Sequence, residues 1–103
     1  MVSVYCHQNN IGQLIYYDVN GNDEQTSERS YGLASTLEKL LKYEPVNTQR
    51  GYNVNLGGFS DWVQLGLHKP SVTIESGKHP CPLAISEFDA IWFRHRESWA
   101  MLC

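Results

Sequence analysis

Blocks of apolar and polar residues alternate along the chain and predict alternating strands and helices. Short apolar runs rich in β-branched and aromatic residues indicate buried strands. Four leucines, Leu33, Leu37, Leu40 and Leu41, recur at the spacing of one helix face. The pattern predicts strands over 2–6, 11–19 and 71–75, and helices from Thr26 or Ser27 to about Tyr43, over 59–67, and from Ser86 onward.

Two segments complete this outline. Pro45 and Gly51 predict a loop over 44–55, with a short extended piece at 52–54 as a fourth strand. In the last helix, the helical spacing predicts a buried face made of Phe88, Ile91, Trp92, His95, Trp99 and Leu102. Strands that alternate with helices indicate an α/β fold, here with three to four strands and three helices.

Length and charge narrow the class of protein. A chain of 103 residues is enough for a single domain spanning 1–103. Eight basic and eleven acidic residues give a net charge of −3, which argues against nucleic-acid binding. We expect no membrane partner, because no apolar run approaches spanning length. Three cysteines without a Cys-x-x-Cys pair indicate free thiols in a reducing compartment, so the predicted location is cytoplasmic.

Two chemically capable residues stand at the ends of predicted strands. His7 follows the first apolar strand, and Glu75 ends the Ser-Val-Thr-Ile-Glu strand. In α/β sheets, ligands bind outside the carboxyl ends of strands. The two residues are therefore candidates for one site, although either one alone is more often a solvated surface residue.

The order of motifs resembles the C-terminal portion of the catalytic domain of zinc carboxypeptidases. The succession is His7, Gly-Gly-Phe-Ser-Asp-Trp at 57–62, Thr-Ile-Glu at 73–75, and Pro82-Leu83 leading into the last helix. Within that family, the likeness is greatest to bacterial enzymes that cleave γ-D-glutamyl bonds to diamino acids in cell-wall peptides. The Ile-Tyr-Tyr run at 15–17 and the Phe59-Ser60 pair carry this finer resemblance.

The resemblance implies a role for each matching residue. His7 would be a zinc ligand and Glu75 the general base, with zinc as the cofactor of the parent family. Ser60 would lie at the base of the substrate pocket, and a substrate-contacting tyrosine would fall at Tyr52, or at Asn53 by a gapless count. The implied ligand is a peptide of the murein type.

Most of a zinc site is missing from this sequence. Catalytic zinc needs three protein ligands, and the family takes its first two from a His-x-x-Glu pair. The third residue after each histidine is instead Asn10, Ser71, Pro82 or Ser98. The prediction is that this chain binds no stoichiometric zinc and is inactive alone.

Three readings of the function stay open at this point. The chain is a truncated metallopeptidase-like domain, a metal-free peptide-binding module, or one half of a split metallopeptidase. In each case the strand that carries His7 would have an unpaired edge, and such edges recruit other chains. A homo-oligomer or a poorly soluble monomer is therefore expected.

Overall fold

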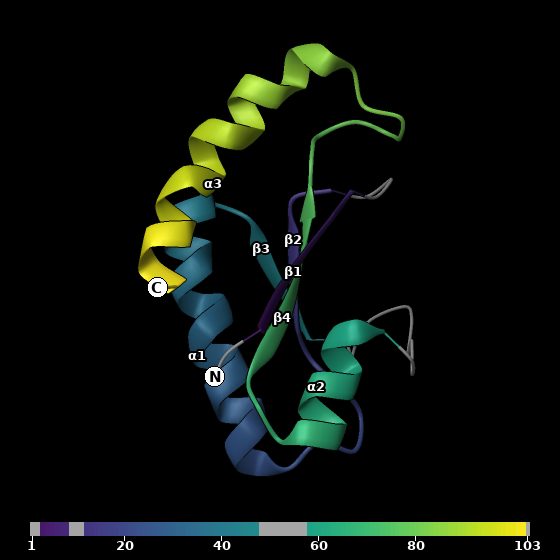
Figure 1. Ribbon diagram of the computed structural model, residues 1–103, viewed down its shortest axis with the longest axis vertical. Helices are drawn as coiled ribbons and strands as arrows, with labels where there is room; N and C mark the ends of the chain where they lie inside the picture. The colour runs from purple at the N-terminus through teal and green to yellow at the C-terminus, as the bar shows by residue number, and fades with distance from the viewer. Residues whose placement is uncertain (1–2, 9–11, 48–57, 103) are drawn as a thin grey trace.

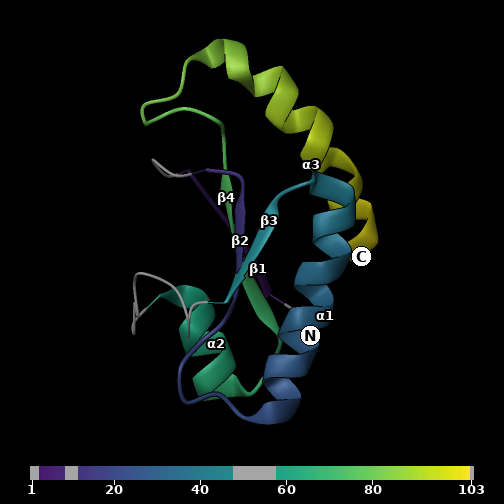
Figure 2. The same cartoon turned by 180° about the vertical axis from the view of Figure 1, so that it is seen from behind.

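The computed structural model describes residues 3–8, 12–47 and 58–102, and its elements form three layers. Figure 1 shows the sheet seen from its edge, with α1 and α3 on one side and α2 on the other. Figure 2 shows the same layers from behind. The elements are β1 Ser3–Gln8, β2 Leu14–Asp18, α1 Glu24–Leu41, β3 Glu44–Asn47, α2 Phe59–Leu67, β4 Ser71–Ser76, the 3₁₀ turn η1 Ile85–Glu87 and α3 Phe88–Leu102. The predicted α/β fold is confirmed.

The sheet has four strands in the order β1-β4-β2-β3. β4 pairs in parallel with β1 and antiparallel with β2, and β2 pairs in parallel with β3. The first strand of the chain therefore lies beside the last. Ser3 pairs with Ser71 at one end of the β1–β4 ladder, and Gln8 pairs with Ser76 at the other.

β3 corrects the prediction of a loop over 44–55. The segment Glu44–Asn47 forms a strand at the edge of the sheet, where the backbone nitrogen of Glu44 donates to the carbonyl of Gln13 at 3.1 Å. Pro45 has no N–H to donate, and an edge strand tolerates this because one of its sides has no ladder to support. The extended piece expected at 52–54 lies outside the described residues.

α1 packs its buried face on the sheet through a stripe that differs from the predicted one. Leu37 and Leu41 are fully buried as expected, but Leu40 is exposed, and the small residues Ala34 and Ser30 continue the stripe instead. Small side chains let the helix approach closely, and the Ser30 hydroxyl accepts a hydrogen bond from the backbone nitrogen of Ser71 at 3.2 Å. The core cluster comprises Ile15, Ala34, Leu37, Leu41, Tyr43, Val72 and Ile74.

The helix also begins two residues earlier than predicted. Its N-cap is Asp23, whose carboxylate accepts from the backbone nitrogen of Thr26 at 2.9 Å. Hydrogen bonds from Thr26, and then from His68, lower the pKa of the Asp23 carboxyl to about 2.

α3 packs on α1 and buries only part of the face predicted for it. His95 and Ser98 are buried, whereas Phe88, Trp92 and Trp99 are exposed, which corrects the expected burial of these three aromatic residues. The helix is preceded by η1, in which the backbone nitrogen of Glu87 donates to the carbonyl of Ala84 at 3.0 Å.

α3 makes polar contacts with the chain where α1 ends. The ring nitrogen Nε2 of His95 lies 3.1 Å from the hydroxyl of Tyr43, and the two rings meet edge to face. Arg94 donates to the carbonyl of Leu41 at 2.8 Å, at the end of α1, and its guanidinium lies over the Tyr43 ring. Burial, and then the charge of Arg94, lowers the pKa of the His95 imidazole.

We expect acid to weaken this contact. Because the folded state holds the pKa of His95 below its unfolded value of about 6.5, the neutral form is favoured on folding, and this contribution to stability is present above that pH. It is lost as the pH falls through the lowered folded pKa. Thermal unfolding between neutral pH and pH 5 should show a falling midpoint.

A matched pair of variants isolates the histidine responsible. His95→Gln should flatten the pH dependence, since no proton is then taken up at this position. Gln25→Ala changes an exposed, uncharged residue of α1 and should leave the slope unchanged. An unaltered slope in His95→Gln would contradict the assignment.

Candidate functional site

The candidate site lies where β1 and β4 run side by side. In the parallel ladder, His7 stands directly opposite Glu75, one pair before the carboxyl end of both strands. His7 is therefore inside β1 and not after it, because the strand extends to Gln8. Glu75 is also opposite Leu14 of β2, so it stands in the middle of three strands.

The side chains of β4 divide between the two faces of the sheet. Val72 and Ile74 belong to the apolar core under α1. Because successive side chains point to opposite faces, Ser71, Thr73 and Glu75 belong to the other face, the one that α2 covers. The site is therefore on the α2 side of the sheet.

A hydrogen bond attaches α2 to this face near Glu75. The hydroxyl oxygens of Ser60 and Thr73 lie 2.8 Å apart, and Ser60 is buried. Ser60 is in the first turn of α2, which begins after Gly58. Thr73 and Glu75 are successive residues on one face, separated by about 7 Å along the strand. Ser60 and Glu75, which are 15 residues apart in the sequence, thus lie on the same face of the sheet.

Glu75 is buried, with only 5% of its surface exposed. Tyr16 of β2 shares its face, because Tyr16 pairs with Thr73. Burial, and then the negative charge of Glu75, raises the pKa of the Tyr16 phenol. The charge of Glu75 is therefore felt by a phenol from the neighbouring strand.

Two glycines shape the chain beside Glu75. The backbone nitrogen of Gln13 donates to the carbonyl of Glu75 at 2.6 Å. A Cβ on Gly12 would overlap the carbonyl oxygen of Gly77, so the two backbone segments meet at a distance that only glycine permits. Gly77 has a φ of 93°, and a Cβ there would collide with Leu83. This close approach places the residues just before β2 against the residues just after β4.

Gln64 joins α2 to the elements around it. Its Nε2 donates to the carbonyls of Ser71 at 2.9 Å and Tyr17 at 3.2 Å, and its Oε1 accepts from Asn22 at 2.6 Å. Asn22 also donates to the carboxylate of Asp18 at 3.3 Å. The amide of Gln64 is fully buried, so these bonds fix the position of α2 over the sheet.

The other predicted residues have different outcomes. Tyr52 and Asn53 lie outside the described residues. Asp61, in the motif at 57–62, accepts from the backbone nitrogen of Gly58 at 3.3 Å, at the start of α2. Trp62, from the same motif, is 57% exposed and lies against Gly66 of the same helix.

The donor set does not fit a zinc centre. Among the described residues, no group of three or more His, Cys, Asp or Glu side chains is placed to hold a metal ion. Catalytic zinc requires three such ligands, and the implied set leaves His7 without its two companions. We therefore derive no chemical step through zinc. In the same part of the chain, no helix combines the length and apolar character needed to cross a membrane.

Comparison with known proteins gives one distant relative. The chain is similar to gamma-D-glutamyl-L-diamino acid endopeptidase 1 of Lysinibacillus sphaericus, with 30% identity over 81 residues. The match covers 79% of this chain and 19% of the relative, so it spans about a fifth of that protein's length. No protein-family model and no solved structure matches. The predicted likeness to this group of peptidases is confirmed as a distant relationship, and membership of the zinc carboxypeptidase family stays a prediction.

Several residues of the site were not singled out from the sequence. Thr73 and Tyr16 could have been assigned to the face of Glu75 from the period of two along their strands. The contact between Gly12 and Gly77 has no local signal, because it joins segments far apart in the chain. From the sequence, Gln64 resembles a solvent-facing helix residue. The one sign that it is buried is its spacing of four residues from Ser60, which places both side chains on the same face of the helix.

Removing the amide of Gln64 should destabilise the fold. In Gln64→Leu, the carbonyls of Tyr17 and Ser71 lose their donor in a buried setting, and we expect a loss of about 2–3 kcal/mol in the free energy of unfolding. Chemical denaturation followed by tryptophan fluorescence measures this change. Gln25→Leu, at an exposed position of α1, is the matched control and should stay within about 0.5 kcal/mol. Equal losses in both variants would contradict the role of Gln64.

Proposed function

We propose that the chain is a peptidase-like domain that binds γ-D-glutamyl peptides of the cell-wall class where β1 and β4 end. The observation that carries the proposal is the register of the two parallel strands, which sets His7 opposite Glu75 near their carboxyl ends. Ligands of α/β folds bind outside this end of a sheet. The name of the distant relative supports the substrate class.

In this proposal each candidate residue has its own role. Glu75 is the general base, a carboxylate that takes a proton from the attacking water. Ser60, held by Thr73, lies at the base of the pocket and leaves room for a long side chain, because it is small. Tyr52 or Asn53 contacts the substrate, and His7 is the position of a metal ligand in the complete enzyme.

Hydrolysis would require residues that this sequence does not contain. No histidine of the chain is followed at the third place by a glutamate, so the companions of His7 would have to come from another polypeptide segment. The chain is therefore proposed to act as a truncated, metallopeptidase-like domain that is inactive alone. A reducing, cytoplasmic setting is part of the proposal, since Cys81 is an exposed thiol.

Binding of a γ-D-glutamyl-L-diamino acid dipeptide tests the location of the site. Amide signals of Ser60, Thr73 and Glu75 should shift on titration in nuclear magnetic resonance spectra. Glu75→Gln should weaken binding about three- to tenfold, because an ammonium group of the dipeptide loses a nearby negative charge.

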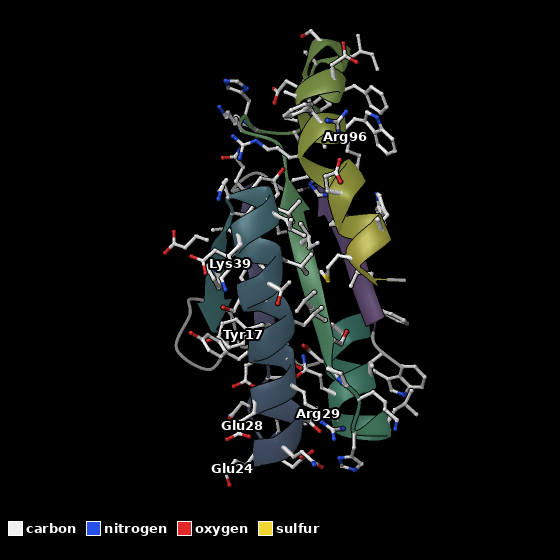
Figure 3. The ribbon with its side chains drawn as sticks, turned by 90° about the vertical axis from the view of Figure 1, so that its left-hand side faces the viewer. Tyr17, Glu24, Glu28, Arg29, Lys39 and Arg96 are labelled. Carbon is white, nitrogen blue, oxygen red and sulfur yellow. The ribbon has the colours of Figure 1, made fainter. Side chains whose placement is uncertain are left out.

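Glu28→Gln removes one negative charge from α1, on the far side of the sheet, and serves as the control (Figure 3). Its affinity for the dipeptide should equal that of the wild type. Equal affinities for the wild type and both variants, or signal shifts confined to α1, would contradict the proposed location of the site.

A second experiment separates binding from catalysis. With zinc added, the chain alone should release no diamino acid above background and should retain close to no zinc after dialysis, measured by elemental analysis. Zinc-dependent hydrolysis that Glu75→Gln abolishes would overturn the proposed inactivity. Activity that appears only when a second chain with a His-x-x-Glu pair is added would instead identify one half of a split enzyme.

A further inference from the structure

Tyr16 of β2 lies on the same face of the sheet as Glu75. Its neighbours on the strand point the other way: Ile15 belongs to the core under α1, and the Tyr17 ring lies 5.3 Å from the ring of Tyr31 on that helix. Figure 3, which looks onto α1, shows Tyr17 on this side. Because successive side chains of a strand alternate between faces, Tyr16 faces the side that α2 covers.

The strand register places Tyr16 diagonally across from Glu75. Tyr16 pairs with Thr73 in the antiparallel ladder of β2 and β4, and Glu75 is two residues further along β4. Such diagonal positions are about 7–8 Å apart, within reach of an aromatic side chain. Burial, and then the charge of Glu75, raises the pKa of the Tyr16 phenol above its ordinary value. At neutral pH the phenol is therefore protonated and can donate a hydrogen bond.

The Tyr16 hydroxyl is a donor that the described fold leaves for a ligand. Across residues 3–8, 12–47 and 58–102, no hydrogen bond involves this hydroxyl, and the side chain is only partly buried. The hydroxyls of Ser60 and Thr73 on the same face lie 2.8 Å apart and bond to each other. The phenol thus extends a face whose smaller hydroxyl groups are already engaged.

A carboxylate and a phenol on neighbouring strands match the two polar groups of an amide. An amide N–H donates and its carbonyl oxygen accepts, whereas the Glu75 carboxylate accepts and the Tyr16 hydroxyl donates. A negatively charged ligand group suits the position beside Tyr16 less well. It would lie close to Glu75, which is 5% exposed, and like charges repel strongly where water is excluded. The neutral carbonyl of an amide meets no such repulsion.

We propose that Tyr16 contacts the ligand directly, with its hydroxyl donating a hydrogen bond to the carbonyl oxygen of the γ-glutamyl amide beside Glu75. This inference rests on the proposed function, and it adds a residue that orients the amide. In a complete enzyme the same hydrogen bond would hold the amide on which Glu75 acts. The chain alone makes and breaks no covalent bond in this step, so the effect is measured as affinity.

Isothermal titration calorimetry with the γ-D-glutamyl-L-diamino acid dipeptide tests the contact. Tyr16→Phe keeps the ring and removes the hydroxyl, so binding should weaken about three- to tenfold, the loss typical of one hydrogen bond. Tyr17→Phe is the matched control. It removes the same group from the adjacent residue, whose ring packs against Tyr31 on the α1 side, and its affinity should equal that of the wild type.

A second ligand separates direct contact from a structural role. In an (E)-alkene isostere of the dipeptide, a carbon–carbon double bond replaces the amide bond and removes the carbonyl oxygen. The wild type and Tyr16→Phe should bind this isostere with equal affinity, because the acceptor of the hydrogen bond is gone. If Tyr16 only supported the fold, its substitution would weaken the binding of both ligands to the same extent.

The possible failures can be told apart. A wild type that does not bind the dipeptide refutes the proposed function, and the role of Tyr16 with it. Equal binding of the dipeptide by the wild type and Tyr16→Phe refutes the role of Tyr16 alone and leaves the site in place. A loss in Tyr16→Phe that is the same for the dipeptide and the isostere also overturns the inference, since it shows that the hydroxyl does not contact the carbonyl.

Discussion

The position of β4 at the centre of the sheet is the constraint on which the other elements depend. It pairs in parallel with β1 on one side and antiparallel with β2 on the other. Its apolar side chains, Val72 and Ile74, complete the core under α1. Its polar side chains receive α2, through the hydrogen bond between Thr73 and Ser60. β1 has no other partner in the described sheet, so the place of His7 also follows from β4.

The two faces of β4 differ in the interactions that cover them. On the α1 side, contact is mainly apolar, and small residues such as Ala34 let the helix approach. On the α2 side, the covering helix is fixed by the buried amide of Gln64 and the hydroxyl of Ser60. Buried polar groups must be hydrogen-bonded, so this face tolerates few arrangements of α2. A face of this kind holds a carboxylate such as Glu75 in a defined position.

Much of the local structure could be predicted from the sequence, because its signals are local. The bounds of α2 and the position of β4 follow from apolar spacing and from the glycines and prolines that end each segment. β3 was missed because Pro45 indicates a loop unless the strand is known to be an edge. The adjacency of His7 and Glu75 joins residues far apart in the chain: their places at strand ends and the family resemblance both suggested a shared site, but neither gave the strand register. For α3 the predicted burial of Phe88, Trp92 and Trp99 was wrong, because periodicity shows which residues share a face and not what covers them.

The pairing of β1 with β4 sets an order of events during protein synthesis. β1 is synthesised before its partner, which begins only at Ser71, after 62 intervening residues. At about 5–20 residues per second, the nascent strand waits roughly 3–12 s before any β4 exists to pair with it. Throughout that interval, a six-residue uncharged segment is open to other nascent chains on the same messenger. Yield in the cell should therefore depend on translation speed and chaperone supply more than the stability of the finished fold would suggest.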